Sequence, residues 1–270
     1  APAVADGFAV NVNEEKWTRL PKLPAPRYAP AVELWNGRLS YTYEVFDINN
    51  ISPSASAVIR ALEGSNASSS IGFQLERDTR DKIINTTSGN RVEVNLRFAG
   101  GPLGGSNINN NYSVEFRGSQ FFPIFELQSQ VLALIARGGV IQNFGDSNDV
   151  PYYNKYYLGG PQTLRGFEFR EVSPRDPFNE PIGGKTYGFF SAEYSADIVS
   201  PIRFAIFYDA GFVNKGAYDF NPSKYHDNFG FGLRLFVAGA PLSLDFGIPI
   251  TGSKEAMKGN QFNFSFGTRF

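Results

Sequence analysis

Apolar and polar residues alternate one by one along several segments of this chain. From Arg91 to Phe98 every second residue is Val, Val, Leu or Phe, and the residues between them are Arg, Glu, Asn and Arg. Side chains of a β-strand point alternately to its two faces, so this pattern predicts a strand with one apolar and one polar surrounding. The same alternation recurs at residues 38–45, 71–76, 112–117, 203–210 and 242–248. The pattern therefore predicts an all-β fold built from amphipathic strands.

The turn signals between these segments predict about 12 strands, an even number of the kind found in bacterial single-chain membrane barrels. Strands are expected near residues 28–35, 38–47, 71–77, 91–98, 112–120, 128–140, 187–195, 202–212, 229–237, 242–248 and 262–270, with a weaker candidate from Phe8 to Asn13. Asn36-Gly37 is a strong signal for a two-residue hairpin between the strands on either side of it. Long connections, such as residues 49–69 and 141–185, alternate with short ones along much of the chain.

Two architectures fit such strands, a water-soluble sandwich and a membrane-spanning β-barrel. A sandwich would turn its charged face to water, whereas a barrel encloses that face in a wet lumen and turns the aromatic face to lipid. Aromatic residues make up 15% of the chain and charged residues only 19%, a balance that is unusual for a soluble sandwich. Barrels also join their strands by short turns on one side and long loops on the other. The sequence therefore favours an antiparallel transmembrane β-barrel.

Charge and residue usage argue against several classes of function. The net charge is −1, which gives no electrostatic reason to expect a nucleic-acid partner. Cysteine is absent, so disulfides and thiolate metal sites are excluded, and we expect neither a metal nor a cofactor. The single histidine, His226, falls in a long polar connection, where we expect it to be exposed to solvent. Because no second His or Cys completes a metal or nucleophile site, the sequence does not predict an enzyme.

The longest connection contains the least regular stretch of the chain, Tyr156 to Phe167. Two adjacent glycines and a proline exclude regular secondary structure there, and a single arginine stands among large apolar residues. The stretch is either a surface loop with an incidental arginine or a functional loop. Its candidate functional residues are Gly159, Gly160, Leu164, Arg165, Gly166 and Phe167.

The glycine pair followed by Leu-Arg-Gly-Phe resembles the loop signature of the BamA/TamA outer-membrane insertase superfamily, which also includes two-partner secretion transporters and organellar import barrels. The resemblance implies that the tip of the loop folds back into the barrel lumen. It also implies five strands after the loop, which is the number that the alternation predicts here.

The resemblance covers the C-terminal part of the family's barrel, from Arg38 to Phe270. The family's usual barrel has sixteen strands, with periplasmic domains ahead of it, and neither its first strands nor those domains have a counterpart here. We therefore expect one barrel domain over residues 1–270 without periplasmic domains, in which residues 1–27 stay unassigned. It is either a closed barrel of about 12 strands or part of a larger one.

An arginine inside a lumen needs carboxylate partners, because a desolvated guanidinium without one is costly. Two acids match positions that the resemblance implies face the loop motif. Asp209 lies on a predicted strand in a phase that points inward, and Glu193 lies on the strand that follows the loop. The alternative is that both are ordinary lumen charges, as Glu93 and Asp245 are expected to be.

The end of the chain alternates aromatic with small or polar residues and finishes on an aromatic residue. It resembles the C-terminal signal by which bacterial outer-membrane barrels are recognised for insertion, and the alternative is an ordinary amphipathic last strand. The aromatic residues of this predicted signal are Phe262, Phe264, Phe266 and Phe270.

The resemblance implies an integral protein of a bacterial or organellar outer membrane that inserts other barrel proteins or translocates polypeptides. It would open a lateral seam and pair an exposed strand with a client strand, and a free strand edge can template such pairing. Expected partners are outer-membrane lipid, client barrel proteins or an exported polypeptide, and accessory assembly subunits. The main alternative is a passive pore or a structural barrel anchor without insertase activity, and a soluble β-protein is a third hypothesis.

Overall fold

The computed structural model describes residues 8–11, 16–19, 35–51, 60, 62–125, 127–199, 202–237, 240–267 and 269. The chain divides into two units, residues 1–34 and 35–270. In the first unit, β1 (Phe8–Asn11) and β2 (Lys16–Arg19) form a two-stranded antiparallel sheet. Among the described residues, no helix has the length and apolar character needed to cross a membrane.

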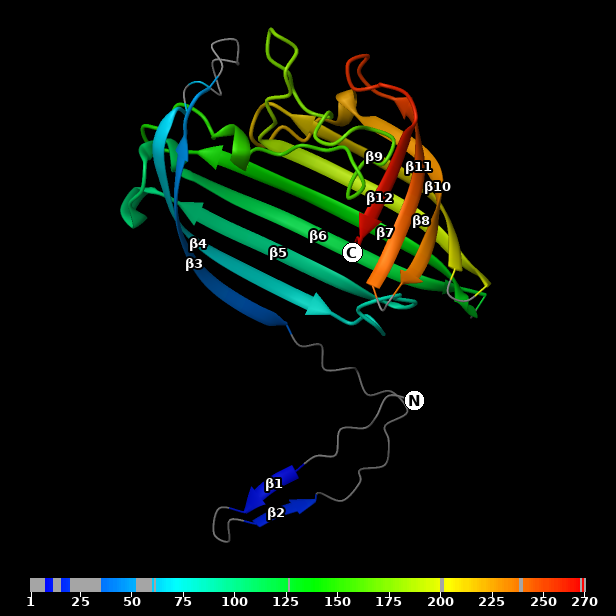
Figure 1. Ribbon diagram of the computed structural model, residues 1–270. Helices are drawn as coiled ribbons and strands as arrows, with labels where there is room; N and C mark the ends of the chain where they lie inside the picture. Colours follow the sequence, from blue (N-terminus) through cyan, green and yellow to red (C-terminus); the bar gives the residue numbers. More distant parts are fainter. Residues whose placement is uncertain are drawn as a thin grey trace. The chain divides into compact units, whose positions relative to one another are not determined.

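The second unit is built on one ten-stranded antiparallel sheet in which each strand pairs with its neighbours in the sequence (Figure 1). The all-β prediction is therefore confirmed. In order, the strands are β3 (Asn36–Ile48), β4 (Gly64–Asp78), β5 (Gly89–Ala99), β6 (Asn111–Ile124), β7 (Leu127–Asn143), β8 (Thr186–Val199), β9 (Ile202–Asn214), β10 (His226–Val237), β11 (Ala240–Thr251) and β12 (Gln261–Phe266).

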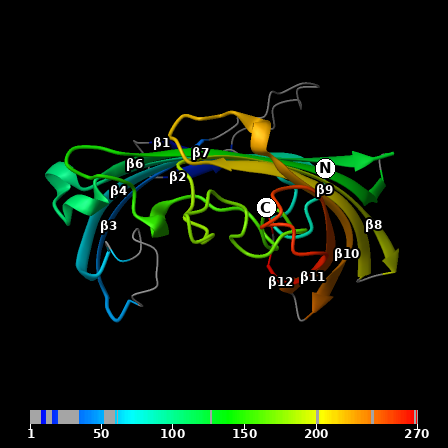
Figure 2. The ribbon, with the colours of Figure 1, turned by 90° about the horizontal axis from the view of Figure 1, so that it is seen from above.

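The sheet is strongly curved, and the segment between β7 and β8 lies on its concave side (Figure 2). The alternation seen in the sequence separates the two faces. On β9, Phe204, Ile206 and Tyr208 are exposed, whereas the residues between them, Ala205 and Phe207, are buried. Because side chains alternate along a strand, β9 carries an apolar face outward and presents its other face to the concave side.

The strand count differs from the sequence-based expectation of about 12. The sheet has ten strands, β1 and β2 belong to the other unit, and most of the expected strand at 28–35 lies outside the described residues. The hairpin predicted at Asn36-Gly37 is wrong. Both residues are the first two of β3, and they form the last two pairs of its ladder, with Glu76 and Leu75 of β4.

The start of β4 also differs from expectation. β4 begins at Gly64, inside the expected loop 49–69. The prediction missed this start because the first half of β4 consists mostly of small polar residues, which show no apolar alternation. At the other end, β3 and β12 occupy the two edges of the sheet, and no pairing joins them in the part of the chain that the structure describes. The described sheet is therefore open.

Candidate functional site

The motif loop, residues 144–185, connects β7 to β8 and doubles back on itself. Isolated antiparallel bridges join Tyr156 to Gly184 and Leu158 to Val172, so both arms of the loop are held together. The chain runs from the end of β7 onto the concave face and returns to the start of β8, and these two bridges hold the outgoing and returning arms together (Figure 2). The loop is thus an ordered element with a defined tip.

The tip is shaped by the two adjacent glycines. Gly159 and Gly160 have φ angles of 109° and 88°, which side-chain-bearing residues rarely adopt. The hydroxyl of Thr163 accepts a hydrogen bond from the Gly159 amide at 2.9 Å. The Gly160 amide donates to the carbonyl of Phe167, also at 2.9 Å, and closes the tip. This compact turn fixes the backbone on both sides of Arg165.

Two apolar residues of the motif anchor the tip. Leu164 and Phe167 are completely buried in a hydrophobic cluster between the loop and the concave face of the sheet. The remaining members of the cluster come from the loop, from β7, β8 and β9 and from the β11–β12 connection: Ile135, Leu158, Val172, Tyr187, Phe189, Val213 and Ala256. Burial of such side chains contributes roughly 1.5–3 kcal/mol each, so the tip is held by packing as well as by charge.

Arg165 is completely buried and makes a two-pronged ion pair with Asp209 on β9. Its Nε donates to Asp209 Oδ2 and its Nη2 to Asp209 Oδ1, both at 2.9 Å. Its Nη1 donates to Glu193 Oε2 on β8 at 2.5 Å. The guanidinium also lies over the ring of Phe207, 3.3 Å from the ring centroid. The structure thus brings together the three charged residues that the sequence singled out.

Both carboxylate oxygens of Asp209 accept hydrogen bonds from several donors. In addition to Arg165, it accepts hydrogen bonds from the Ser191 hydroxyl at 2.6 Å and from the Asn228 amide at 3.1 Å. Ser191 and Asn228 are the register partners of Asp209 on the two neighbouring strands. Cross-strand pairing therefore places both donors beside the acid, which orients it toward the loop.

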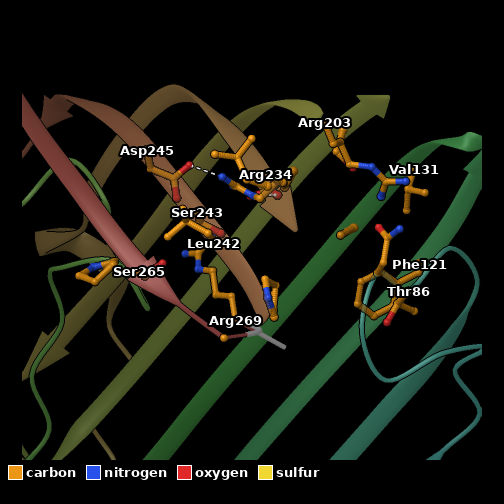
Figure 3. A pocket seen from close by; sticks show the side chains of 18 of the residues that line it. Thr86, Phe121, Val131, Arg203, Arg234, Leu242, Ser243, Asp245, Ser265 and Arg269 are labelled. Atoms are coloured by element: carbon orange, nitrogen blue, oxygen red, sulfur yellow. Dashed lines mark hydrogen bonds and ion pairs between the residues drawn. The ribbon is translucent and has the colours of Figure 1, made fainter. Parts of the chain in front are cut away.

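A second arginine extends the cluster. Arg234 on β10 donates to Glu193 Oε2 at 2.8 Å and to Asp245 Oδ1 at 2.7 Å. Arg165 lies 3.7 Å from the other oxygen of Asp245. Arg234 and Asp245, joined by this ion pair, line a cavity of about 90 Å³ that Arg203 and Arg269 also line (Figure 3). Asp245 is therefore part of the site, not the incidental lumen charge that the sequence suggested.

The charges keep Arg165 protonated. Burial by itself lowers the pKa of Arg165, but the negative charges of Asp209 and Glu193 outweigh this effect and raise the pKa above its usual value. Among the described residues, no group of three or more His, Cys, Asp or Glu is arranged to hold a metal ion.

Two glycines allow the loop to approach the sheet closely. A Cβ atom at Gly247 on β11 would lie 2.4 Å from the carbonyl oxygen of Arg165, and one at Gly166 would lie 2.5 Å from Cβ of Asn228. Neither distance is compatible with a side chain unless the backbone moves. Gly166 was part of the predicted motif, and this close approach gives the physical reason for a glycine there.

Some residues of the site escaped the sequence reasoning. On β10, Phe231 and Leu233 face outward, and Arg234 is the next residue, so its side chain points to the opposite face. The alternation could therefore have identified Arg234 as inward-facing. Ser191 and Asn228 carry no such signal, because only the register of the sheet places them beside Asp209. The prediction for His226 is wrong: it begins β10, is half-buried, and packs against Phe167 with ring centroids 5.5 Å apart.

The predicted C-terminal signal lies on β12. Phe262, Phe264 and Phe266 are 68%, 53% and 64% exposed, so they share the outward-facing side of the strand. Phe270 lies outside the described residues. Recognition through these aromatic residues stays a prediction.

The match to the Omp85 superfamily domain spans residues 7–270. The chain is 30% identical over 242 residues to the outer membrane protein assembly factor BamA of Nitratidesulfovibrio vulgaris, which covers 87% of this chain and 29% of that protein. It is 28% identical over 247 residues to a SAM50-like protein of Schizosaccharomyces pombe, which covers 85% of this chain and 51% of that protein. The chain thus spans about half or less of these relatives' length.

Among solved structures, BamA from Haemophilus ducreyi lacking POTRA domains 1–3 matches with a TM-score of 0.67 at 20% identity, over 86% of this chain and 51% of that chain. At this identity the likeness shows a shared β-barrel fold. The family match covers almost the whole chain, including every strand of the large sheet and the motif loop. The chain therefore belongs to the Omp85 superfamily and is an integral β-barrel protein of the outer membrane.

Proposed function

We propose that this protein assembles other β-barrel proteins into the outer membrane by pairing their strands with its own terminal strand. The observation that carries the proposal is the short edge strand β12. It pairs only with residues Leu242 to Gly247 of β11, and its other edge has no partner among the described residues. An unpaired strand edge is a template for another strand, because its backbone donors and acceptors are free.

The relatives support this proposal by their names. One is an outer membrane protein assembly factor, and another relative, from Homo sapiens, is a sorting and assembly machinery component with 25% identity over 142 residues. Client barrel proteins, outer-membrane lipid and accessory assembly subunits are accordingly the proposed partners. We propose that the protein acts without covalent chemistry, since strand pairing requires only hydrogen bonding and lipid exchange.

The alternative of a passive pore is disfavoured by the motif loop. Its tip packs against the concave face of the sheet and is pinned there by buried ion pairs, which reduces the space through which solutes could pass. A conducting pore would require the loop to leave this position. Single-channel conductance of the reconstituted protein therefore separates the two functions: an assembly factor with a fixed loop conducts weakly, and a passive pore conducts steadily.

The direct test uses site-specific cross-linking, for which the absence of native cysteine is convenient. Ser265 on β12 and Ser243 on β11 are register partners, so Ser265→Cys and Ser243→Cys form a matched pair. β11 pairs with a strand on each side, whereas β12 has one edge without a partner among the residues that the structure describes. A client barrel carrying one cysteine in its terminal strand is added unfolded to liposomes that contain either variant.

We expect disulfide capture of the client by Ser265→Cys and little capture by Ser243→Cys. Client insertion is followed in parallel by heat-dependent gel mobility and protease protection. Insertion no faster than in protein-free liposomes would contradict the assembly function. Insertion without capture at position 265 would contradict only the role of β12.

A further inference from the structure

The chain turns sharply after β12. Gly267 has a φ angle of 93°, and its amide donates to the carbonyl of Pro241 at 2.9 Å. Beyond this turn the side chain of Arg269 is 10% exposed and lies on the concave side, where it lines the same cavity as Arg234 and Arg203 (Figure 3). Arg269 therefore lies on the concave side of the sheet, and we call Gly267 and Arg269 the terminal segment.

The guanidinium of Arg269 contacts the sheet and the motif loop at once. Its Nη2 donates to Asp209 Oδ1 at 3.2 Å and to the carbonyl of Thr163 in the loop tip. Its Nη1 donates to the Ser191 hydroxyl at 3.1 Å. Asp209 consequently holds two arginines, Arg165 from the loop and Arg269 from the terminal segment.

Two other contacts join the same parts of the chain. The Asn263 amide on β12 donates to the carbonyl of Arg165 at 2.7 Å. Arg137 on β7 donates through Nη2 to the Arg269 carbonyl at 2.6 Å and through Nη1 to the Gln162 carbonyl at 3.2 Å. Side chains from β7, from β12 and from the terminal segment thus join the loop tip to the C-terminal end of the sheet.

Arg269 also belongs to the cluster of buried charges around Asp209. Three carboxylates meet in the cluster, those of Glu193, Asp209 and Asp245, and three guanidiniums face them, those of Arg165, Arg234 and Arg269. Removing Arg269 would take away one of the two guanidiniums that pair with Asp209, whose carboxylate is completely buried. An uncompensated buried charge is unfavourable, so the remaining contacts of Asp209 would have to rearrange.

We propose that Arg269 is a positioning residue that couples the terminal edge strand β12 to the tip of the motif loop. Because Arg269 binds both Asp209 and Thr163, a change that disorders the edge strand also disorders the loop tip, and the reverse. This coupling concerns the structure alone. Its consequence, that a client strand meets a β12 edge whose position depends on the loop, rests on the proposed assembly function.

Hydrogen–deuterium exchange of the full chain in lipid nanodiscs tests the coupling. The amides of Gly160 and Phe167 report on the loop tip, and those from Phe262 to Gly267 report on β12 and its turn. We expect Arg269→Ala to accelerate exchange in both segments by roughly tenfold, as expected for losing a hydrogen bond to a charged group. Arg269→Lys keeps the positive charge but loses the two Nη donors of the guanidinium. Compared with Arg269→Ala, it should restore part of the protection from exchange in both segments.

Arg203→Ala is the matched control. Arg203 is a buried arginine on the same cavity, but its ion-pair partner is Asp197 and it does not contact the loop tip. We expect this variant to leave exchange in both reporter segments unchanged. Faster exchange of β12 in Arg269→Ala with an unchanged loop, or rescue of one segment without the other in Arg269→Lys, would overturn the coupling. These outcomes do not depend on insertion activity, so failure of the proposed function is recognised separately by the client assay.

Discussion

At the scale of single residues, the site depends on a buried arginine whose charge is matched by facing acids. Arg165 enters from a loop, whereas Asp209 and Glu193 are fixed on adjacent strands. Buried ion pairs add little net stability, because desolvation offsets much of the attraction, but breaking one is strongly unfavourable. The cluster therefore acts mainly to specify where the loop lies.

Substitution of Arg165 or Asp209 should release the loop. We expect Arg165→Ala and Asp209→Ala each to cost up to about 3–5 kcal/mol if the cluster is dry and less if water enters. The double variant should cost less than the sum, because the second substitution removes a charge that the first left unpaired. Protease cleavage between Gly159 and Asn179 and urea unfolding measure both effects.

The matched control for this cycle is Arg175→Ala. Arg175 is also a loop arginine, but it pairs with Glu171 within the loop and has no contact with the Asp209 cluster. We expect its substitution to leave the loop tip protected. Additive effects of Arg165→Ala and Asp209→Ala, or cleavage of the unmodified loop at the same rate, would contradict the role of the pair.

A substitution that leaves every charge in place, Gly247→Ala, should also release the loop. Gly247→Ala places a Cβ atom 2.4 Å from the Arg165 carbonyl oxygen, so either the loop or β11 must move. We expect faster proteolysis of the loop tip, and a melting temperature lowered in keeping with the roughly 1–3 kcal/mol typical of overpacking. At Gly216, by contrast, a Cβ atom would meet nothing closer than 3.6 Å. If Gly216→Ala and Gly247→Ala behave alike, close approach of the loop is not the cause.

At the scale of elements, the strands separate two surroundings. β9 shows this most clearly, because its exposed residues are all apolar and alternate with buried ones that reach the ion-pair cluster. Since the outward faces of neighbouring strands are in register, for example Phe73 opposite Leu96, the apolar surface continues across the sheet. A continuous apolar outer face is what lipid contact requires.

Spin labels along β9 should report this alternation. We expect lipid-soluble oxygen to quench labels at Phe204, Ile206 and Tyr208 more than labels at Ala205 and Phe207. A charged residue such as Ile206→Arg should cost roughly 2–4 kcal/mol at the bilayer midplane. Residues Arg91 to Phe98 on β5 provide a second series with the same expected alternation. Uniform quenching along both strands would contradict the lipid-facing assignment.

At the scale of the whole molecule, the described sheet is curved but open, with β3 at one edge and β12 at the other. The two edges differ in length, because β3 has 13 residues and β12 has 6. β12 also ends in a turn that directs Arg269 to the concave side. The terminal end is therefore the part of the sheet in which edge, loop and charge cluster meet.

The end of the chain should matter more for assembly than for stability. We expect deletion of Phe270, or Phe270→Asp, to slow assembly-factor-assisted folding, because recognition reads the terminal aromatic residues before the barrel forms. Unassisted refolding into detergent should change much less. Heat-dependent gel mobility measures both yields, and Phe169→Ala, at an exposed loop aromatic residue, is the control. Equal losses with and without the assisting factor would contradict a recognition role.

The sequence by itself determined the strands, the motif loop and two of its acid partners. Period-two alternation predicts strands because it follows from the local geometry of one chain, and it predicted an inward phase for Asp209. The resemblance of the motif loop to its family implied that Arg165 is the partner of this acid. Five strands after the loop were also predicted correctly. Alternation fails where side chains are small and polar, which is why the start of β4 was missed. The Asn36-Gly37 pair forms no hairpin turn, because both residues pair with β4 as the first two residues of β3.

Only the tertiary structure decided which polar residues meet. Ser191 and Asn228 reach Asp209 because of strand register, and register depends on pairing between segments that are far apart in the sequence. The contact between Arg269 and the loop spans more than a hundred residues and depends on the curvature of the sheet. His226 was misplaced for the same reason, since its burial depends on a loop that folds over it from elsewhere in the chain.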